Sequence, residues 1–170
     1  MNTWFHAAAN VTVAHRLQRR LPWLKLRTVF LSSLVPDLPL FFLTLWYFSV
    51  YGFGFGTQYD ALFYNDPLWV VSHNLFHAPF VITALATAGL LLRSGGLASF
   101  AFGTALHSLF DIFTHHDDGP LLLFPFDMST RFSSPVSYWD PEHYGLIVFP
   151  IETALMVAIG VYGIFVRRRR

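Results

Sequence analysis

Four long apolar stretches divide the chain. They cover roughly Val29 to Val50, Leu75 to Leu92, Leu97 to Phe113 and Gly145 to Val166. Each is close to the ~20 residues that a helix needs to cross a bilayer. The pattern therefore predicts an all-α fold, an integral membrane helical bundle with four spanning helices.

A further helix is expected before the first stretch. Residues Thr3 to Leu21 are apolar at the front and basic at the back, which is the reverse of a secretory signal peptide. This N-terminal helix either spans the membrane or lies along its interface, with the basic side toward lipid phosphates. No internal repeat or linker interrupts the chain, so residues 1–170 are interpreted as one membrane-embedded domain.

The basic residues indicate how the bundle is oriented. They gather in Arg16 to Arg27, at Arg93 and in Arg167 to Arg170, which are alternate ends of the four stretches. Because positive loops stay in the cytoplasm, the sequence predicts a multi-pass protein of the inner (plasma) membrane with a cytoplasmic C-terminus. Residues 51–72 and 114–144 then face outward.

Composition narrows the possible partners. Hydrophobic residues make up 54% of the chain and charged residues 12%, so no basic face is large enough to bind nucleic acid. Membrane lipid is the expected surrounding. Because the chain has no cysteine, any metal ion must be held by nitrogen and oxygen atoms. Nothing in the sequence specifies an oligomeric state.

Several ionisable residues interrupt the apolar stretches, although such residues are expensive in lipid. With a rise of about 1.5 Å per residue from each cytoplasmic turn, six of them fall between ~16 and ~24 Å, in the outer half of the membrane. These six are His6, Asp37, His77, His107, Asp111 and Glu152. Prolines lie beside three of them, where they open the helix and free backbone carbonyls.

The spacing of these residues suits metal binding. His73 and His77 are four residues apart, as are His107 and Asp111, and His115 continues the second row by one turn. Residues i and i+4 share one helix face and can reach one ion. Imidazole and carboxylate ligands suit a divalent metal ion, zinc in the first place, with manganese or iron as alternatives.

A structural interpretation is also available for each residue. A histidine and an aspartate on neighbouring helices can hydrogen-bond to each other and fix helix packing. For any one of these residues the two interpretations are about equal. Six of them in one band favour a functional site, since intramembrane ionisable groups are usually functional.

The order of the motifs resembles a known family. An early histidine (His6), the PDLP segment with Asp37, HNLFHAP with His77, and His107 followed by Asp111 resemble the YbcI/YdjM-type family of membrane-bound metal-dependent hydrolases. That family is similar to zinc-dependent phospholipases C, which are all-helical enzymes with clustered zinc ions. The resemblance covers nearly the whole chain and implies a zinc-dependent hydrolase. This chain departs from the family's PD-x-D pattern, with Pro39 in place of the second acidic residue, and from its histidine-rich segment.

The outward segment 114–144 is predicted to form a lid over the site. Arg131 is its only cation and could hold an anionic group such as a phosphate, or pair with Asp127. Trp139 is suited to line a substrate-binding site, and equally to belong to the belt of aromatic residues at the membrane interface. Asp118 is interpreted as a solvating residue at the end of the preceding helix.

Three functions remain open from the sequence. The first is a hydrolase in which Asp37, His77, His107 and Asp111 bind metal and Asp111 or Glu152 is the catalytic base. Its expected substrate is a phosphoester or another small or lipid-linked molecule at the outer face. The second is a metal carrier, which the almost purely apolar stretches below the band disfavour. The third is a structural or regulatory membrane protein with a degenerate site.

Overall fold

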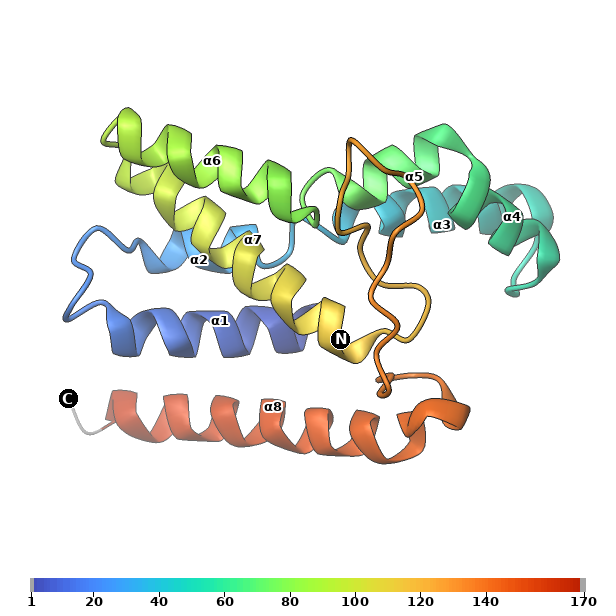
Figure 1. Ribbon diagram of the computed structural model, residues 1–170. Coiled ribbons are helices and arrows are strands. Elements are labelled where there is room, and N and C mark those ends of the chain that lie inside the picture. Colours follow the sequence, from blue (N-terminus) through green and yellow to red (C-terminus); the bar gives the residue numbers. More distant parts are fainter. Residues whose placement is uncertain (1, 169–170) are drawn as a thin grey trace.

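The chain is almost entirely helical. The computed structural model describes residues 2–168, which form eight α-helices, one short 3-10 helix and no strand (Figure 1). The helices are α1 (Thr3–Leu17), α2 (Leu26–Ser32), α3 (Leu38–Tyr51), α4 (Thr57–Asn65), α5 (Pro67–Asn74), α6 (Pro79–Leu91), α7 (Gly95–Thr114), η1 (Pro141–His143) and α8 (Gly145–Arg168). The predicted all-α fold is confirmed.

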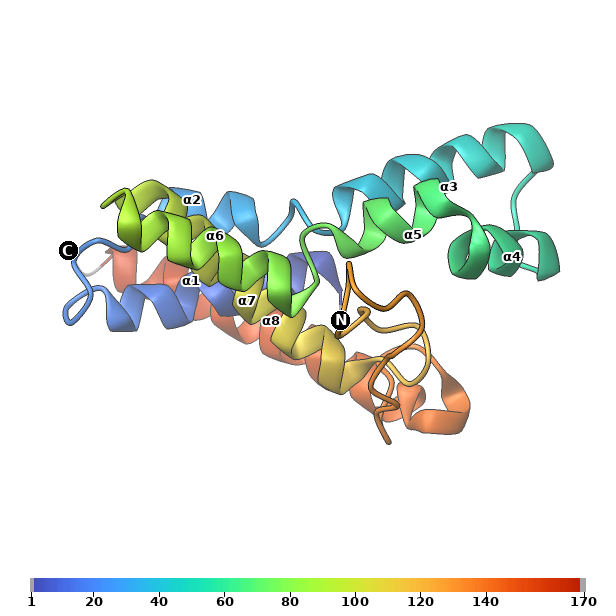
Figure 2. The ribbon, with the colours of Figure 1, turned by 45° about the horizontal axis from the view of Figure 1, so that its top comes forward.

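The helices form two parts. They are joined at residues 33–37 and 75–78, here called the waist. One part, the bundle, consists of α1, α2, α6, α7 and α8. Helix α7 contacts α1, α2 and α6, and α8 packs against α1. The other part, the arm, consists of α3, α4 and α5 and extends away from the bundle (Figures 1 and 2). Residues 115–144, the lid, run from the end of α7 to the start of α8 and include η1.

Fewer helices than predicted are long enough to cross a membrane. Among residues 2–168, α7 and the Gly145–Gly163 part of α8 are long and apolar enough, and α5 and α6 qualify only together, as a pair bent by 45°. Helix α3 has 14 residues, or about 21 Å, which is less than the ~30 Å hydrocarbon core. By length and composition there are two spans, or three with the bent pair, where the sequence predicted four. Arg169 and Arg170 of the predicted cytoplasmic tail lie outside the described residues.

One predicted helix is broken, and another begins four residues later than predicted, after a break that separates it from α5. The stretch Val29 to Val50 is divided by a turn over residues 33–37, and residues 75–78 separate α5 from α6. Prolines explain both breaks, because a proline has no N–H to donate and pushes the preceding residue toward extended backbone. Pro36 lies in the first turn, and Ala78, just before Pro79, has extended backbone angles. Apolarity alone carries no signal for these breaks.

Close approach of backbones holds the bundle together. A Cβ atom on Gly103 of α7 would lie 1.9 Å from Ser32 Oγ and 3.0 Å from the carbonyl oxygen of Val29, so α2 packs directly on the glycine. Asn10 of α1 donates from Nδ2 to Ser33 Oγ at 2.9 Å and to the Gly103 carbonyl at 3.1 Å. Helices α1, α2 and α7 are therefore fixed against each other on the bundle side of the waist.

Candidate metal centre

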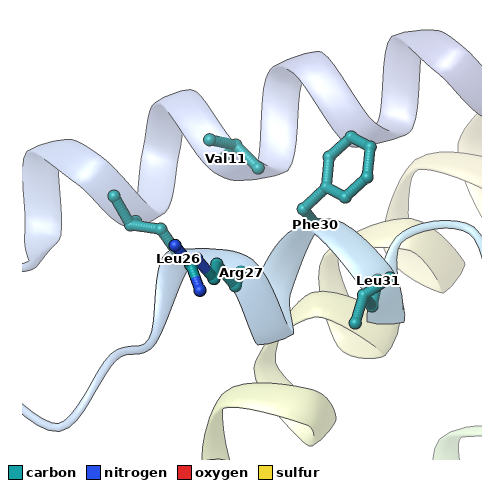
Figure 3. Close-up of a pocket in the computed structure, with 5 residues that line it drawn as sticks. All are labelled: Val11, Leu26, Arg27, Phe30 and Leu31. Carbon is teal, nitrogen blue, oxygen red and sulfur yellow. The ribbon is translucent and has the colours of Figure 1, made fainter.

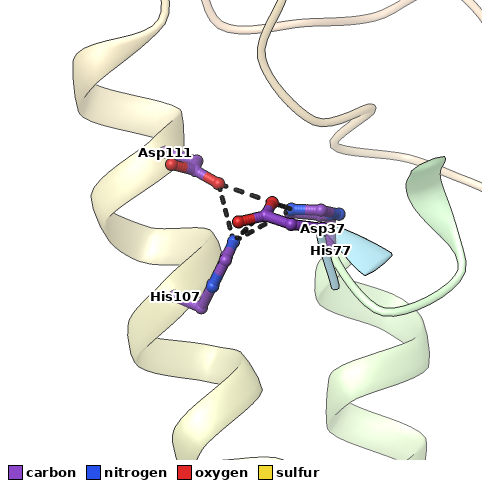
Figure 4. Close-up of side chains that lie close together, drawn as sticks. All are labelled: Asp37, His77, His107 and Asp111. Atoms are coloured by element: carbon purple, nitrogen blue, oxygen red, sulfur yellow. Dashed lines mark hydrogen bonds and ion pairs between the residues drawn. The ribbon is translucent and has the colours of Figure 1, made fainter. Parts of the chain in front are cut away.

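Four side chains converge at the waist, between the bundle and the arm. Asp37 comes from the turn before α3, His77 from the break between α5 and α6, and His107 and Asp111 from one face of α7. Figure 4 shows the four side chains pointing toward one another. One ligand atom from each lies within 4.8 Å of the others, and all except Asp37 are buried. This group can hold a metal ion.

Five of the six separations between these ligand atoms are those expected around one small ion, and all six are within 4.8 Å. His77 Nε2 and His107 Nε2 are 3.2 Å apart. Asp37 Oδ1 lies 3.2 Å from His107 Nε2 and 3.5 Å from His77 Nε2. Asp111 Oδ2 lies 3.0 and 3.4 Å from the same two nitrogens. In a tetrahedral zinc site with bonds of 2.0–2.1 Å, neighbouring ligand atoms are about 3.3 Å apart.

The backbone determines which nitrogen of each histidine faces the site. His77 Nδ1 lies 2.5 Å from the carbonyl oxygen of His73, and His107 Nδ1 lies 2.9 Å from that of Ser33. A carbonyl oxygen only accepts, so each Nδ1 carries a proton and donates it. In the neutral rings both Nε2 lone pairs then point at each other and at two carboxylates. A metal ion among these electron pairs would satisfy all of them, and carbonyl-bound Nδ1–H groups are what orient metal-binding histidines.

His6 contacts two of the four converging residues, His107 and Asp111. It is fully buried on α1, and its ring stacks on that of His107 with centroids 3.7 Å apart. His6 Nε2 lies 2.9 Å from Asp111 Oδ1, the oxygen turned away from His77 and His107. The structure thus places this predicted ligand beside the four-residue group, where it orients the Asp111 carboxylate.

His115 approaches the same oxygen from the lid. Its Nε2 lies 3.4 Å from Asp111 Oδ1 and its Nδ1 lies 2.9 Å from Asp118 Oδ1. Trp139 Nε1 donates to the other oxygen of Asp118 at 2.8 Å. Burial raises the pKa of Asp118, but the hydrogen bonds from His115 and Trp139 outweigh it and hold that pKa below its usual value. The predicted residues His115 and Trp139 therefore belong to one chain of contacts that leads to Asp111.

His73 contributes its backbone. Its buried ring lies between Phe63 and His77, with centroids 5.2 and 4.7 Å away, and neither ring nitrogen has a hydrogen-bond partner in the described structure. The ring is not among the four converging ligands, whereas the His73 carbonyl holds His77 Nδ1.

The start of α1 contacts the carboxylates of Asp37 and Glu152. Thr3 Oγ1 donates to Asp37 Oδ2, and the backbone N–H of Asn2 donates to Glu152 Oε1 at 2.6 Å. Glu152 is buried on α8, and its Oε2 has no hydrogen-bond partner in the described structure. Sequence reasoning missed Asn2 and Thr3. Their only signal was a pair of small polar residues at the start of an apolar helix, which is typical of a helix cap.

Arg131 anchors the lid on the arm. Its NH1 group donates to the Gly119 carbonyl, and its guanidinium lies over the rings of Phe63 and Tyr64, 5.7 and 5.6 Å from their centroids. Asp127, the alternative partner, instead accepts hydrogen bonds from Ser129 and Thr130. Within residues 2–168 Arg131 forms no ion pair, so its charge is not neutralised by a direct contact.

An apolar hollow opens between the lid and α8. It has a volume of about 270 Å³, and its walls are Tyr138, Trp139, Gly145, Leu146, Phe149 and Pro150. The ring of Tyr138 also packs against His115, with centroids 5.1 Å apart. A chain of side-chain contacts, from Tyr138 to His115 to Asp111, thus runs from the wall of the hollow to the four converging residues.

No family model, curated protein or solved structure matches the chain. Function therefore has to be inferred from the site itself.

Proposed function

We propose that the protein is a membrane-bound metal-dependent hydrolase whose ion is held by Asp37, His77, His107 and Asp111. The observation that carries the proposal is the convergence of two histidine Nε2 atoms and two carboxylates, with nitrogen–nitrogen and nitrogen–oxygen separations of 3.0–3.5 Å and all four groups within 4.8 Å of one another. Zinc fits this donor set and these separations, and manganese or iron accepts the same atoms. The resemblance to the YbcI/YdjM-type family belongs to the same proposal.

A bound ion of this kind lowers the pKa of water and polarises a phosphoryl or acyl oxygen. The chain itself supplies the positioning and the proton acceptor. Asp111 is occupied on both oxygens, by His6 and His115 on one and by His77 and His107 on the other. Glu152 keeps Oε2 without a hydrogen-bond partner in the described structure. We therefore favour Glu152 over Asp111 as the catalytic base.

The proposed substrate is a lipid-linked or other amphiphilic phosphoester. The hollow beside Tyr138 has apolar walls suited to the start of a hydrocarbon chain, and it is connected to Asp111 through His115. Arg131, which has no ion pair within the described chain, is the proposed contact for an anionic group. Trp139, which forms one wall of the hollow, is a second proposed contact for the substrate.

The proposed location is the inner membrane, with several passes and a cytoplasmic C-terminus. The two to three candidate spans and the one-sided distribution of arginines support it. Reporters fused after residue 170 and in the turn at Arg93 should then read cytoplasmic, and a reporter in residues 51–60 external. The opposite signals would overturn this orientation.

Metal content separates this proposal from the structural alternative. The histidine–aspartate separations are also hydrogen-bond distances, so protons alone could hold the same four groups together. We expect purified wild-type protein to carry about one transition metal ion, and His107→Ala and Asp111→Asn to lose it because each removes a ligand. Asp60→Asn, which changes an exposed carboxylate of the arm, should retain it. Equal, sub-stoichiometric metal in all four proteins would favour the structural alternative.

Hydrolysis is tested on the protein with Zn²⁺ or Mn²⁺ added. We expect release of product from phospholipids or generic phosphodiesters that a chelator abolishes, and no turnover by Asp37→Asn in a folded protein. Wild type that binds metal yet shows no chelator-sensitive release from any of these compounds would refute the phosphoesterase proposal while leaving the metal site intact.

A further inference from the structure

A second hollow lies on the bundle, between α1 and α2. It has a volume of about 480 Å³, and Figure 3 shows its five walls: Val11, Leu26, Arg27, Phe30 and Leu31. Phe30 and Leu31 are 41% and 58% exposed, so the described chain leaves much of their apolar surface uncovered. Four apolar side chains and one arginine thus form an open groove.

The charges around this groove are of one sign. The α1–α2 segment carries Arg16, Arg19, Arg20, Lys25 and Arg27, whereas residues 1–36 and 67–110 contain no aspartate or glutamate. The α6–α7 turn with Arg93 lies at the same end of the bundle (Figures 1 and 2). Every ion pair among residues 2–168 instead joins a histidine to a carboxylate of the candidate metal centre or of the lid. Arg27 is therefore exposed without a neighbouring carboxylate to neutralise it.

We propose that this groove binds an anionic phospholipid. Its phosphate contacts the Arg27 guanidinium, and one acyl chain lies against Val11, Phe30 and Leu31. Basic pockets between helices on the cytoplasmic side of a membrane bind anionic headgroups in this way. A zwitterionic lipid brings its own cation to an end of the protein that is already positive, so it gains less from the same groove. The proposal concerns a different end of the molecule from the metal centre and does not depend on hydrolysis.

The test compares two lipids with identical acyl chains, phosphatidylglycerol and phosphatidylcholine. Detergent-purified full-length protein is titrated with each, and bound lipid is counted by native mass spectrometry. We expect phosphatidylglycerol to bind about fivefold more tightly, and Arg27→Gln to remove that preference. Arg20→Gln is the matched control, because it removes the same charge at the same end but outside the groove. Leu31→Asn, which makes one exposed wall polar, should weaken both lipids alike.

Two results would overturn the site. Equal binding of the two lipids by wild type would remove the charge recognition. An equal loss in Arg20→Gln and Arg27→Gln would mean that the net charge of this end attracts lipid and that the groove has no part in it. Thermal unfolding in detergent checks that each variant is folded. If Arg27→Gln unfolds, the Leu31→Asn result decides, since unchanged lipid binding there would exclude the groove.

Discussion

The candidate metal centre draws on two kinds of helix. Helix α7 is continuous, and it presents His107 and Asp111 on one face, one turn apart. The other two ligands come from breaks: Asp37 from the turn between α2 and α3, and His77 from the segment between α5 and α6. A continuous helix can align ligands in a row, but it cannot surround an ion. The breaks redirect the backbone so that two further ligands face the row from other sides.

The breaks also supply the groups that orient the histidines. The last carbonyls of a helix have no partner within that helix. The carbonyl of Ser33, just after α2, accepts from His107 Nδ1, and the carbonyl of His73, in the last turn of α5, accepts from His77 Nδ1. Ser108 of α7 in turn donates to the carbonyl of His77. Broken and continuous helices therefore hold each other's ligands in place.

The largest expected effect tests the continuous helix. Gly103→Ala in α7 would put a Cβ atom 1.9 Å from Ser32 Oγ and 3.0 Å from the Val29 carbonyl oxygen, so the Ser32 hydroxyl must rotate and the backbone of α2 must yield slightly. We expect it to lower the free energy of unfolding by about 3 kcal/mol, the upper part of the range for overpacked cores. Gly160→Ala in α8 is the control, because nothing lies within 4 Å of its Cβ position. The measurement is unfolding in detergent; similar stability of the two variants would show that α7 does not pack on α2 at Gly103.

A smaller effect is expected from the residues behind the ligands. His6→Phe removes the contact to Asp111 Oδ1 but keeps an aromatic ring for stacking on His107. We expect metal affinity to fall by about 10- to 100-fold, as is usual when a ligand loses its supporting hydrogen bond. Competition with a chelator measures it. If His6→Phe lost metal as completely as His107→Ala, that result would indicate that His6 binds the ion directly.

Thr3→Val is the matching change for Asp37, the ligand that comes from the first break. It removes the hydroxyl that donates to Asp37 Oδ2 and keeps a branched side chain of similar size. If breaks and continuous helix depend equally on such support, its effect on metal affinity should equal that of His6→Phe. An unchanged affinity would mean that the turn alone orients Asp37.

The smallest effect concerns the proline at the second break. Pro79→Ala is expected to cost less than about 1 kcal/mol, chiefly by loosening the unfolded chain, and to leave metal content unchanged. The reason is that buried polar groups also hold this break: Asn74 Oδ1 accepts from the Leu121 N–H at 2.7 Å, and Ser108 binds the His77 carbonyl. If Pro79→Ala loses metal in an assay where Asp60→Asn does not, the proline alone maintains the break.

The sequence predicted the ligands better than the backbone that carries them. His107 and Asp111 could be paired from their spacing, because α7 is helical throughout. The same spacing applied to His73 and His77 assumes a helix that ends at Asn74, so the two rings do not form a row. Only the folded chain shows that the His73 carbonyl, which the end of the helix leaves unpaired, is the useful group.

The role of His6 was beyond the sequence for a different reason. Its position in the chain and its expected depth are those of a ligand, and it does reach Asp111. Whether such a residue binds an ion or supports another ligand depends on which atoms fill the nearest positions in three dimensions. Those positions are taken by residues from two breaks that apolarity did not reveal.

The order of the ligands along the chain has a consequence for biosynthesis. Asp37 leaves the ribosome first, His77 follows, and His107 and Asp111 emerge last. Until α7 is made, Asp37 and His77 lack His107 and Asp111, which are the other two of the four converging groups. A metal ion bound by all four groups would therefore act only on the nearly finished chain and would not assist insertion of the early helices. Metal shortage in the cell would then appear as accumulation and degradation of full-length protein, while early intermediates stay unaffected.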